Sequence, residues 1–114
     1  MVTARRRLGD VGESIAAHLL SERGFVICER NVRTISGEID ILARDGKEIA
    51  FVEVRTRRST LGIAAESVGS VKRRRMRRCA LEYCIEKEID PDSARLDVVA
   101  IDLPGGHRPA AAQY

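Results

Sequence analysis

Residues 37–55 read Gly-Glu-Ile-Asp-Ile-Leu-Ala-Arg-Asp-Gly-Lys-Glu-Ile-Ala-Phe-Val-Glu-Val-Arg. The Asp45-Gly46 dipeptide separates two runs of alternating apolar residues, which is the pattern of a β-hairpin. Each run carries an acid in an apolar context, Asp40 in the first and Glu53 in the second. Carboxylates are rarely buried unless they are paired or bind a metal. These two acids are therefore either part of a metal site or an accident of the strand register.

The distribution of apolar residues predicts the register of this hairpin. A four-residue connection over 45–48 places Asp40 opposite Glu53, at about 4.5–5.5 Å between Cβ atoms, where like charges repel unless a cation lies between them. The other predicted pairs are Arg44 with Ile49, Leu42 with Phe51, and Glu38 with Arg55. A one-residue slip would mix the two faces of the hairpin. The second face then carries only apolar side chains, those of Ile39, Ile41, Ala43, Ala50, Val52 and Val54.

Length and composition indicate a single domain with a packed core. The chain has 114 residues, and 44% of them are hydrophobic. We expect one domain over residues 1–103 and a flexible tail over 104–114, where Pro-Gly-Gly precedes an alanine-rich stretch. No run of about 20 apolar residues could span a membrane, and no apolar signal segment follows the basic N-terminus. These features predict a cytoplasmic protein without a membrane association.

The cysteines and histidines do not show a recognisable site. Cys28, Cys79 and Cys84 form no CxxC pair, and His18 and His107 lack zinc-ligand spacing. We interpret the cysteines as reduced thiols that fill the core.

The remaining periodicities complete an α/β pattern. A first helix is predicted over 8–22 and a second over 71–87, with Ser70 as its N-cap. Strands are expected over 25–33, 38–44, 48–56 and 95–102, and residues 63–68 allow a short helical turn. The order α-β-β-β-α-β describes a central mixed sheet with a three-stranded antiparallel meander, flanked by helices. The apolar stripe of the first helix comprises Leu8, Val11, Ile15, Ala16, Leu19 and Leu20.

Positive charge is concentrated in clusters, although the net charge is only +3. Basic residues gather over 5–7, 55–58 and 72–78, and acidic residues gather over 82–92, which predicts an anionic partner on one side of the molecule. Aromatic residues make up only 4% of the chain, so a stacking platform for single strands is absent. This favours duplex or branched DNA contacted through its phosphates. A solvated helix face and a docking face for an acidic protein are the alternatives.

Five short motifs occur in order along residues 8–102. They are Gly12-Glu13, Asn31-x-Arg33, Gly37-Glu38-Ile39-Asp40, Phe51-Val-Glu53-Val-Arg55-Thr-Arg57 and Arg95-x-Asp97-Val98. Together they resemble the YraN-like family, a bacterial branch of the restriction-endonuclease-like (PD-(D/E)XK) nuclease superfamily that is close to archaeal Holliday-junction resolvases. The resemblance implies a restriction-endonuclease-like fold and hydrolysis of DNA, and it leaves a homodimer open.

The resemblance also implies a metal site. Glu13, Asp40 and Glu53 would hold Mg²⁺ or Mn²⁺, which polarises the scissile phosphate and generates hydroxide from bound water. Arg55 stands where the superfamily carries a lysine, and an arginine binds phosphate but cannot act as a general base. Lys72 is the candidate substitute, because it lies on the apolar stripe of the second helix with Val68, Met76, Cys79 and Tyr83. The candidate nucleic-acid contacts are Arg33, Arg57, Lys72, Arg73, Arg74, Arg77 and Arg78.

We therefore expect a metal-dependent DNA endonuclease, structure-selective or resolvase-like in its choice of substrate. Two alternatives stay open: a nucleic-acid-binding module without catalysis, and an interaction protein whose basic helix docks an acidic partner. Simpler interpretations also exist for the acids. Asp40 and Glu53 can be surface acids, Glu13 can complement the positive end of its helix, and Glu38 can pair across the strands with Arg55.

Overall fold

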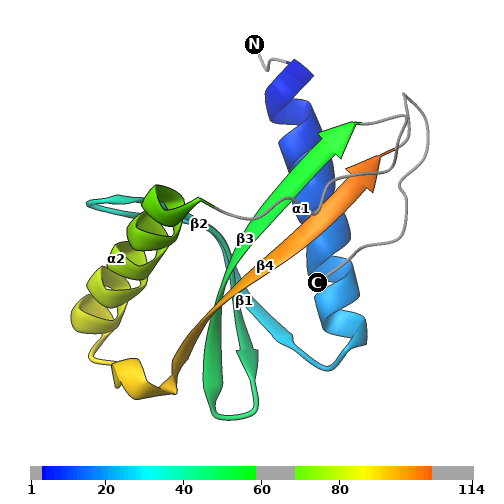
Figure 1. Cartoon of the computed structure of the whole chain (residues 1–114). Coiled ribbons are helices and arrows are strands. Elements are labelled where there is room, and N and C mark those ends of the chain that lie inside the picture. Colours follow the sequence, from blue (N-terminus) through cyan, green and yellow to red (C-terminus); the bar gives the residue numbers. More distant parts are fainter. Residues whose placement is uncertain (1–3, 59–68, 104–114) are drawn as a thin grey trace.

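The computed structural model describes residues 4–58 and 69–103, excluding the side chains of residues 4–7 and 58. The predicted order α-β-β-β-α-β is confirmed (Figure 1). The helical turn expected over 63–68, the tail over 104–114 and Val68 lie outside the described residues. The elements are α1 (Ala4–Glu22), β1 (Val26–Thr34), β2 (Gly37–Asp45), β3 (Glu48–Arg58), α2 (Ser70–Lys87), a 3₁₀ turn (Pro91–Ser93) and β4 (Ala94–Leu103).

The described strands form one mixed sheet in the order β1-β2-β3-β4. The first three make the predicted antiparallel meander, and β3 pairs with β4 in parallel. The β2–β3 hairpin has the predicted register, with Arg44 opposite Ile49 and Leu42 opposite Phe51. The alternation of apolar residues was therefore sufficient to align the two strands.

The β2–β3 ladder ends earlier than the sequence predicted. Its last pair is Ile41 with Val52, one step before Asp40 would oppose Glu53. The Val54 N–H donates to Asp40 Oδ2 at 2.8 Å, so a side chain replaces the backbone partner that would continue the ladder. Beyond this point β2 stays with β1, and β3 stays with β4. The sheet consequently forks at Asp40, and the two arms separate in Figure 1.

The fork corrects two expectations about side-chain position. Glu38 does not oppose Arg55 but lies opposite Arg33 of β1, with 3.9 Å between Glu38 Oε2 and Arg33 Nε. Ile39, expected on the same face as Ile41, packs in the cluster on the other side of the sheet. Both differences arise because β2 turns away from β3, so the alternation of a flat two-stranded ladder no longer applies.

The two described helices pack against different sets of sheet residues. The α1 cluster contains Ala16, Leu20, Ile41, Ala43, Ala50, Val52, Val99, Ile101 and Leu103. The α2 cluster contains Ile39, Leu42, Phe51, Cys79, Ala80, Tyr83 and Cys84. Val11, predicted on the apolar stripe of α1, is instead 48% exposed. Neither described helix is long and apolar enough to cross a membrane.

The stripe predicted for α2 is confirmed where the structure describes it. Met76, Cys79 and Tyr83 are buried on this helix. The predicted N-cap is wrong, because Ser70 is already the first helical residue and Gly69 occupies the cap with extended backbone and no side-chain hydrogen bond.

Polar contacts hold the open arm of the fork against α2. The Ser36 N–H donates to Glu82 Oε1 at 3.0 Å, and the Ser36 hydroxyl donates to Glu82 Oε2. These two bonds, the hydroxyl first, lower the pKa of the Glu82 carboxyl. The turn between β1 and β2 is therefore tied to the helix, which keeps the arm away from β3.

Arg95 joins the closed end of the hairpin to β4. Its guanidinium donates to Asp97 Oδ2 at 2.8 Å, to Glu48 Oε1 at 3.1 Å and to Asp45 Oδ2 at 3.2 Å. The Arg95-x-Asp97 motif thus crosslinks the β2–β3 turn to the start of β4. We assign it a structural role.

Gly12 allows α1 to approach β3 closely. A Cβ at this position would lie 2.8 Å from Thr56 Cβ and Cγ2, and nearer still to Thr56 Oγ1.

Gly12→Ala should therefore lower the free energy of unfolding by about 1–3 kcal/mol, measured by urea denaturation, because overpacking forces the backbone to shift. Gly9→Ala is the control, since nothing lies within 4 Å of its added Cβ; it should raise stability by about 0.5–1 kcal/mol. Equal effects at both positions would contradict the close approach.

Candidate functional site

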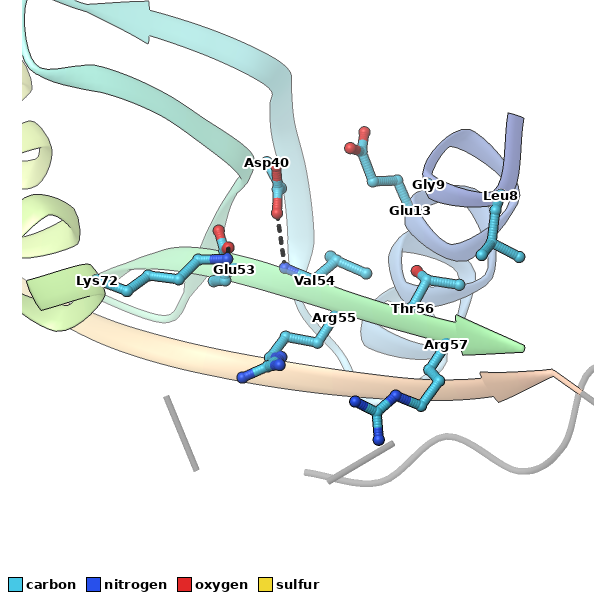
Figure 2. A pocket seen from close by; sticks show the side chains of 10 residues that line it. All are labelled: Leu8, Gly9, Glu13, Asp40, Glu53, Val54, Arg55, Thr56, Arg57 and Lys72. Carbon is cyan, nitrogen blue, oxygen red and sulfur yellow. Dashed lines mark hydrogen bonds and ion pairs between the residues drawn. The ribbon is translucent and has the colours of Figure 1, made fainter. Parts of the chain in front are cut away.

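A polar cavity of about 600 Å³ lies at the fork of the sheet. Figure 2 shows its acidic side chains arriving from different elements: Glu13 from α1, Asp40 from β2 and Glu53 from β3. A neighbouring cavity of about 240 Å³ shares Asp40, Glu53 and Lys72. The fork therefore gathers the predicted acids into one hollow. The other residues that line the larger cavity are Leu8, Gly9, Val54, Arg55, Thr56, Arg57 and Lys72.

Asp40 and Glu53 form a pair of neighbouring carboxyl groups. They face the same two cavities, as the hairpin register predicted, and Glu53 is only 9% exposed. The pKa of Asp40 is raised to about 8, first because burial removes water and then because of the charge on Glu53; the Val54 N–H opposes both effects. The pair therefore holds a proton near neutral pH when no cation is present.

Lys72 reaches this carboxyl pair from the first turn of α2. Its Nζ lies 2.6 Å from Glu53 Oε1, and its side chain is 40% exposed (Figure 2). The position agrees with the stripe that the sequence placed toward the sheet. An ammonium group at this distance compensates the charge of Glu53 and leaves part of the lysine accessible from the cavity.

Glu13 forms the opposite wall of the cavity. Its Oε1 lies 3.5 Å from Arg30 NH2, and burial raises the pKa of the Glu13 carboxyl despite that arginine. Across residues 4–58 and 69–103, no three His, Cys, Asp or Glu side chains come together as a metal-binding group. Glu13 thus faces the Asp40–Glu53 pair across the cavity, and its role as a direct metal ligand stays a prediction.

Two arginines of β3 line the other side of the cavity. Arg55 and Arg57 alternate with Thr56, and Figure 2 shows their guanidinium groups on the β4 side of β3, away from Glu13. The two arginines therefore lie apart from Glu13, whereas Lys72 lies beside Glu53. Carboxylates are the ligands that a hard divalent cation prefers, and guanidinium groups are good donors to phosphate oxygens.

The basic run of α2 continues from the site along the helix surface. The side chains of Arg73, Arg74, Arg77 and Arg78 are exposed, whereas Lys72 is half-buried toward the cavity. Arg74 and Arg78 also line a small hollow beside Ser36 at the turn between β1 and β2. Arg33, the remaining predicted contact, lies on β1 with its side chain 80% exposed. These cations present a basic surface that begins at Lys72.

Sequence reasoning assigned no role to two residues of β1 that contact Glu13. Arg30 is one of them, and Asn31 was noted only as part of a motif. Periodicity could not identify them, because they follow a register shift between Ile27 and Glu29 that changes which side chains face α1.

Comparison with known proteins finds a single family. The model of "Uncharacterised protein family UPF0102" matches residues 12–101, a span that contains every candidate site residue. The chain is similar to a UPF0102 protein of Moorella thermoacetica, with 47% identity over 114 residues that cover 99% of this chain and 95% of that protein. It is 46% identical over 109 residues to a UPF0102 protein of Syntrophus aciditrophicus, covering 94% and 86% of the two chains. A UPF0102 protein of Nocardia farcinica is 43% identical over 106 residues, covering 92% and 84%.

The raised pKa of Asp40 makes the stability of the metal-free protein depend on pH. The pKa of Asp40 is about 8 in the folded state, compared with its ordinary value of 3.8. The protonated Asp40 therefore contributes fully to stability when the pH is below its ordinary pKa, and this contribution is lost as the pH rises through about 8. Asp40→Asn keeps an acceptor for Val54 N–H without a charge. Its free energy of unfolding should therefore fall less between about pH 5 and about pH 9 than that of the wild type, measured by urea denaturation with chelator present.

Asp40→Ala is the matched variant for the hydrogen bond. It leaves Val54 N–H without its acceptor, which should cost about 1–3 kcal/mol across the same pH range. Parallel pH profiles for the wild type and Asp40→Asn would show that Asp40 is ionised in the folded state at neutral pH, contrary to this account.

Proposed function

The chain belongs to the uncharacterised protein family UPF0102, and we propose that it is a metal-dependent nuclease that binds duplex or branched DNA. The observation that carries this proposal is the half-buried Asp40 beside the buried Glu53, with Lys72 Nζ 2.6 Å from Glu53 Oε1, in a cavity that Arg55 and Arg57 also line. The restriction-endonuclease-like resemblance of the same residues supports it.

The residues present fit a hard divalent cation. Mg²⁺ commonly binds through one or two carboxylates and keeps several waters or substrate oxygens, so Asp40 and Glu53 can serve as its principal ligands, and the negative charge of Glu13 across the cavity adds to their attraction for the cation. The proton that Asp40 retains near neutral pH would be replaced by the cation, because a positive charge favours the ionised pair. When bound, Mg²⁺ or Mn²⁺ polarises the phosphate and makes a coordinated water more acidic.

The chain's own side chains supply the remaining functions. Lys72 is partly exposed beside Glu53 and can contact a phosphate oxygen at the reacting centre. Arg55 and Arg57 present guanidinium groups that bind neighbouring phosphates in two-pronged contacts. Because arginine stays protonated, Arg55 and Arg57 cannot accept a proton from the attacking water, and another group must act as the general base. Glu13, whose burial raises its pKa, faces the cavity from the opposite wall and is the candidate acceptor for a proton of the attacking water.

The basic surface of α2 supports a nucleic-acid polymer as the substrate. Exposed arginines continue from Lys72 along the helix, so phosphates on either side of the cleaved bond meet positive charge. A second candidate function is a nucleic-acid-binding module with little or no catalysis. Arg55 in place of the expected lysine favours this second candidate, and only measurements of cleavage separate it from the first.

Metal binding can be measured without any substrate. Mn²⁺ titrated calorimetrically into the wild type near pH 7 should release about one proton, because Asp40 is protonated beforehand. Glu53→Gln should weaken Mn²⁺ binding by roughly 10–100-fold and abolish cleavage of branched DNA. Glu29→Gln is the matched control, since Glu29 is an exposed strand acid. Equal Mn²⁺ affinity for wild type, Glu53→Gln and Glu29→Gln would contradict the metal site.

DNA binding by α2 predicts a steep dependence on salt. Each phosphate neutralised by a cation contributes about −0.9 to the slope of log K against log salt. The double variant Arg74→Ala with Arg78→Ala should therefore flatten the slope by roughly two units without altering sequence preference, measured by fluorescence anisotropy. The control is Arg44→Ala with Lys47→Ala, which removes two exposed cations near the β2–β3 turn. An unaltered slope in the α2 variant would instead favour a protein-docking role for the helix.

A further inference from the structure

Asn31 occupies an unusual place at the fork. Its backbone φ is 55°, a left-handed value that in the described part of the chain only one other non-glycine residue, Glu88, adopts. It lies between Arg30 and Val32, whose β2 partners are Ile41 and Ile39, so its place in the register is across from Asp40. Asparagine tolerates this backbone better than most residues, but glycine would adopt it at lower cost. The side chain is therefore the feature to explain.

The Asn31 amide connects two carboxylates from different elements. With its Nδ2 group toward them, it donates to Glu13 Oε1 at 3.1 Å and to Glu38 Oε1 at 3.2 Å. This orientation follows from chemistry, because an amide oxygen here would meet only acceptors, whereas the NH₂ group has two N–H donors, one for each carboxylate. Asn31 thus links β1 to Glu13 on α1 and to Glu38 on β2.

These contacts determine how Glu13 faces the cavity. Its Oε1 is held by the Asn31 amide and lies 3.5 Å from Arg30 NH2. Within the described residues both contacts engage Oε1, and the Glu13 side chain lines the cavity. The side chain of Glu13 is only 12% exposed, so its carboxylate cannot simply turn into solvent. Without the amide, the negative charges of Glu13 and Glu38 would repel with only arginine side chains to offset them.

We propose that Asn31 is a positioning residue, which orients Glu13 toward the Asp40–Glu53 pair and so sets the affinity of the site for a divalent cation. The inference rests on the proposed function, because the cation site is the one proposed above. Asn31 would thus serve the site through its side chain, in addition to adopting the left-handed backbone conformation at this point of β1.

The test uses Asn31→Gly in the full chain. Glycine keeps the left-handed backbone at lower cost and removes the amide, so the relief of backbone strain offsets part of the lost hydrogen bonds and thermal stability should fall only slightly. Affinity for Mn²⁺, measured by calorimetry, should nevertheless fall by roughly 10–100-fold, the usual effect of losing a residue that orients a metal-site group. Glu88→Gly is the matched control, because it changes the other left-handed residue, at the C-cap of α2, and should leave Mn²⁺ affinity unchanged.

A second readout needs no metal. The Asn31 side-chain NH₂ signals in the NMR spectrum of metal-free protein should shift in Glu13→Gln and in Glu38→Gln. Wild-type Mn²⁺ affinity in Asn31→Gly, or unmoved Asn31 signals, would overturn the positioning role and leave the nuclease proposal intact. A wild-type chain that binds no Mn²⁺ would instead overturn the proposed function and the cation role of Asn31 together.

Discussion

The hydrogen bond from Val54 N–H to Asp40 Oδ2 determines the shape of this molecule's centre. A backbone donor inside a sheet must find an acceptor, and here a side chain supplies it in place of the neighbouring strand. The two strands can then separate without leaving this N–H unpaired. The same bond also places the Asp40 carboxyl at the fork, where burial removes part of its hydration and a second acid, Glu53, is close. Separation of the strands and concentration of charge therefore have one cause.

The fork is kept open by contacts at a distance from it. Ser36 and Glu82 tie the arm formed by β1 and β2 to α2, and Arg95 crosslinks the closed end of the hairpin to β4. The cavity between the arms is lined by side chains from α1, β2, β3 and α2, with Glu13 facing the Asp40–Glu53 pair and Arg55 and Arg57 on a separate side. Near neutral pH the proton on Asp40 and the ammonium group of Lys72 together offset the repulsion between these acids, and carboxyl groups with such shifted pKa values are common at functional sites.

Much of the fold was predictable because its signals are local. The alternation of apolar residues over 37–55 aligned β2 with β3, and the helical period of Met76, Cys79 and Tyr83 identified the buried face of α2. That face in turn placed Lys72 toward the sheet. Apart from Val11 on α1, which is exposed, the predictions that were wrong concern the ends of elements and interruptions of the sheet. The N-cap of α2 and the end of the ladder depend on a single residue's geometry, for which periodicity carries no information.

The order of the elements, the register of the central hairpin and the common orientation of Asp40 and Glu53 can all be read from local sequence, because each follows from the period of side chains along one or two adjacent strands. The partners of these acids, in contrast, depend on how the elements pack together. Glu13 meets Arg30 and Asn31, and Glu53 meets Lys72, across separations in sequence that no local pattern spans. Those contacts depend on how closely the helices approach the sheet and on where the sheet divides, and both are set by packing of the whole domain.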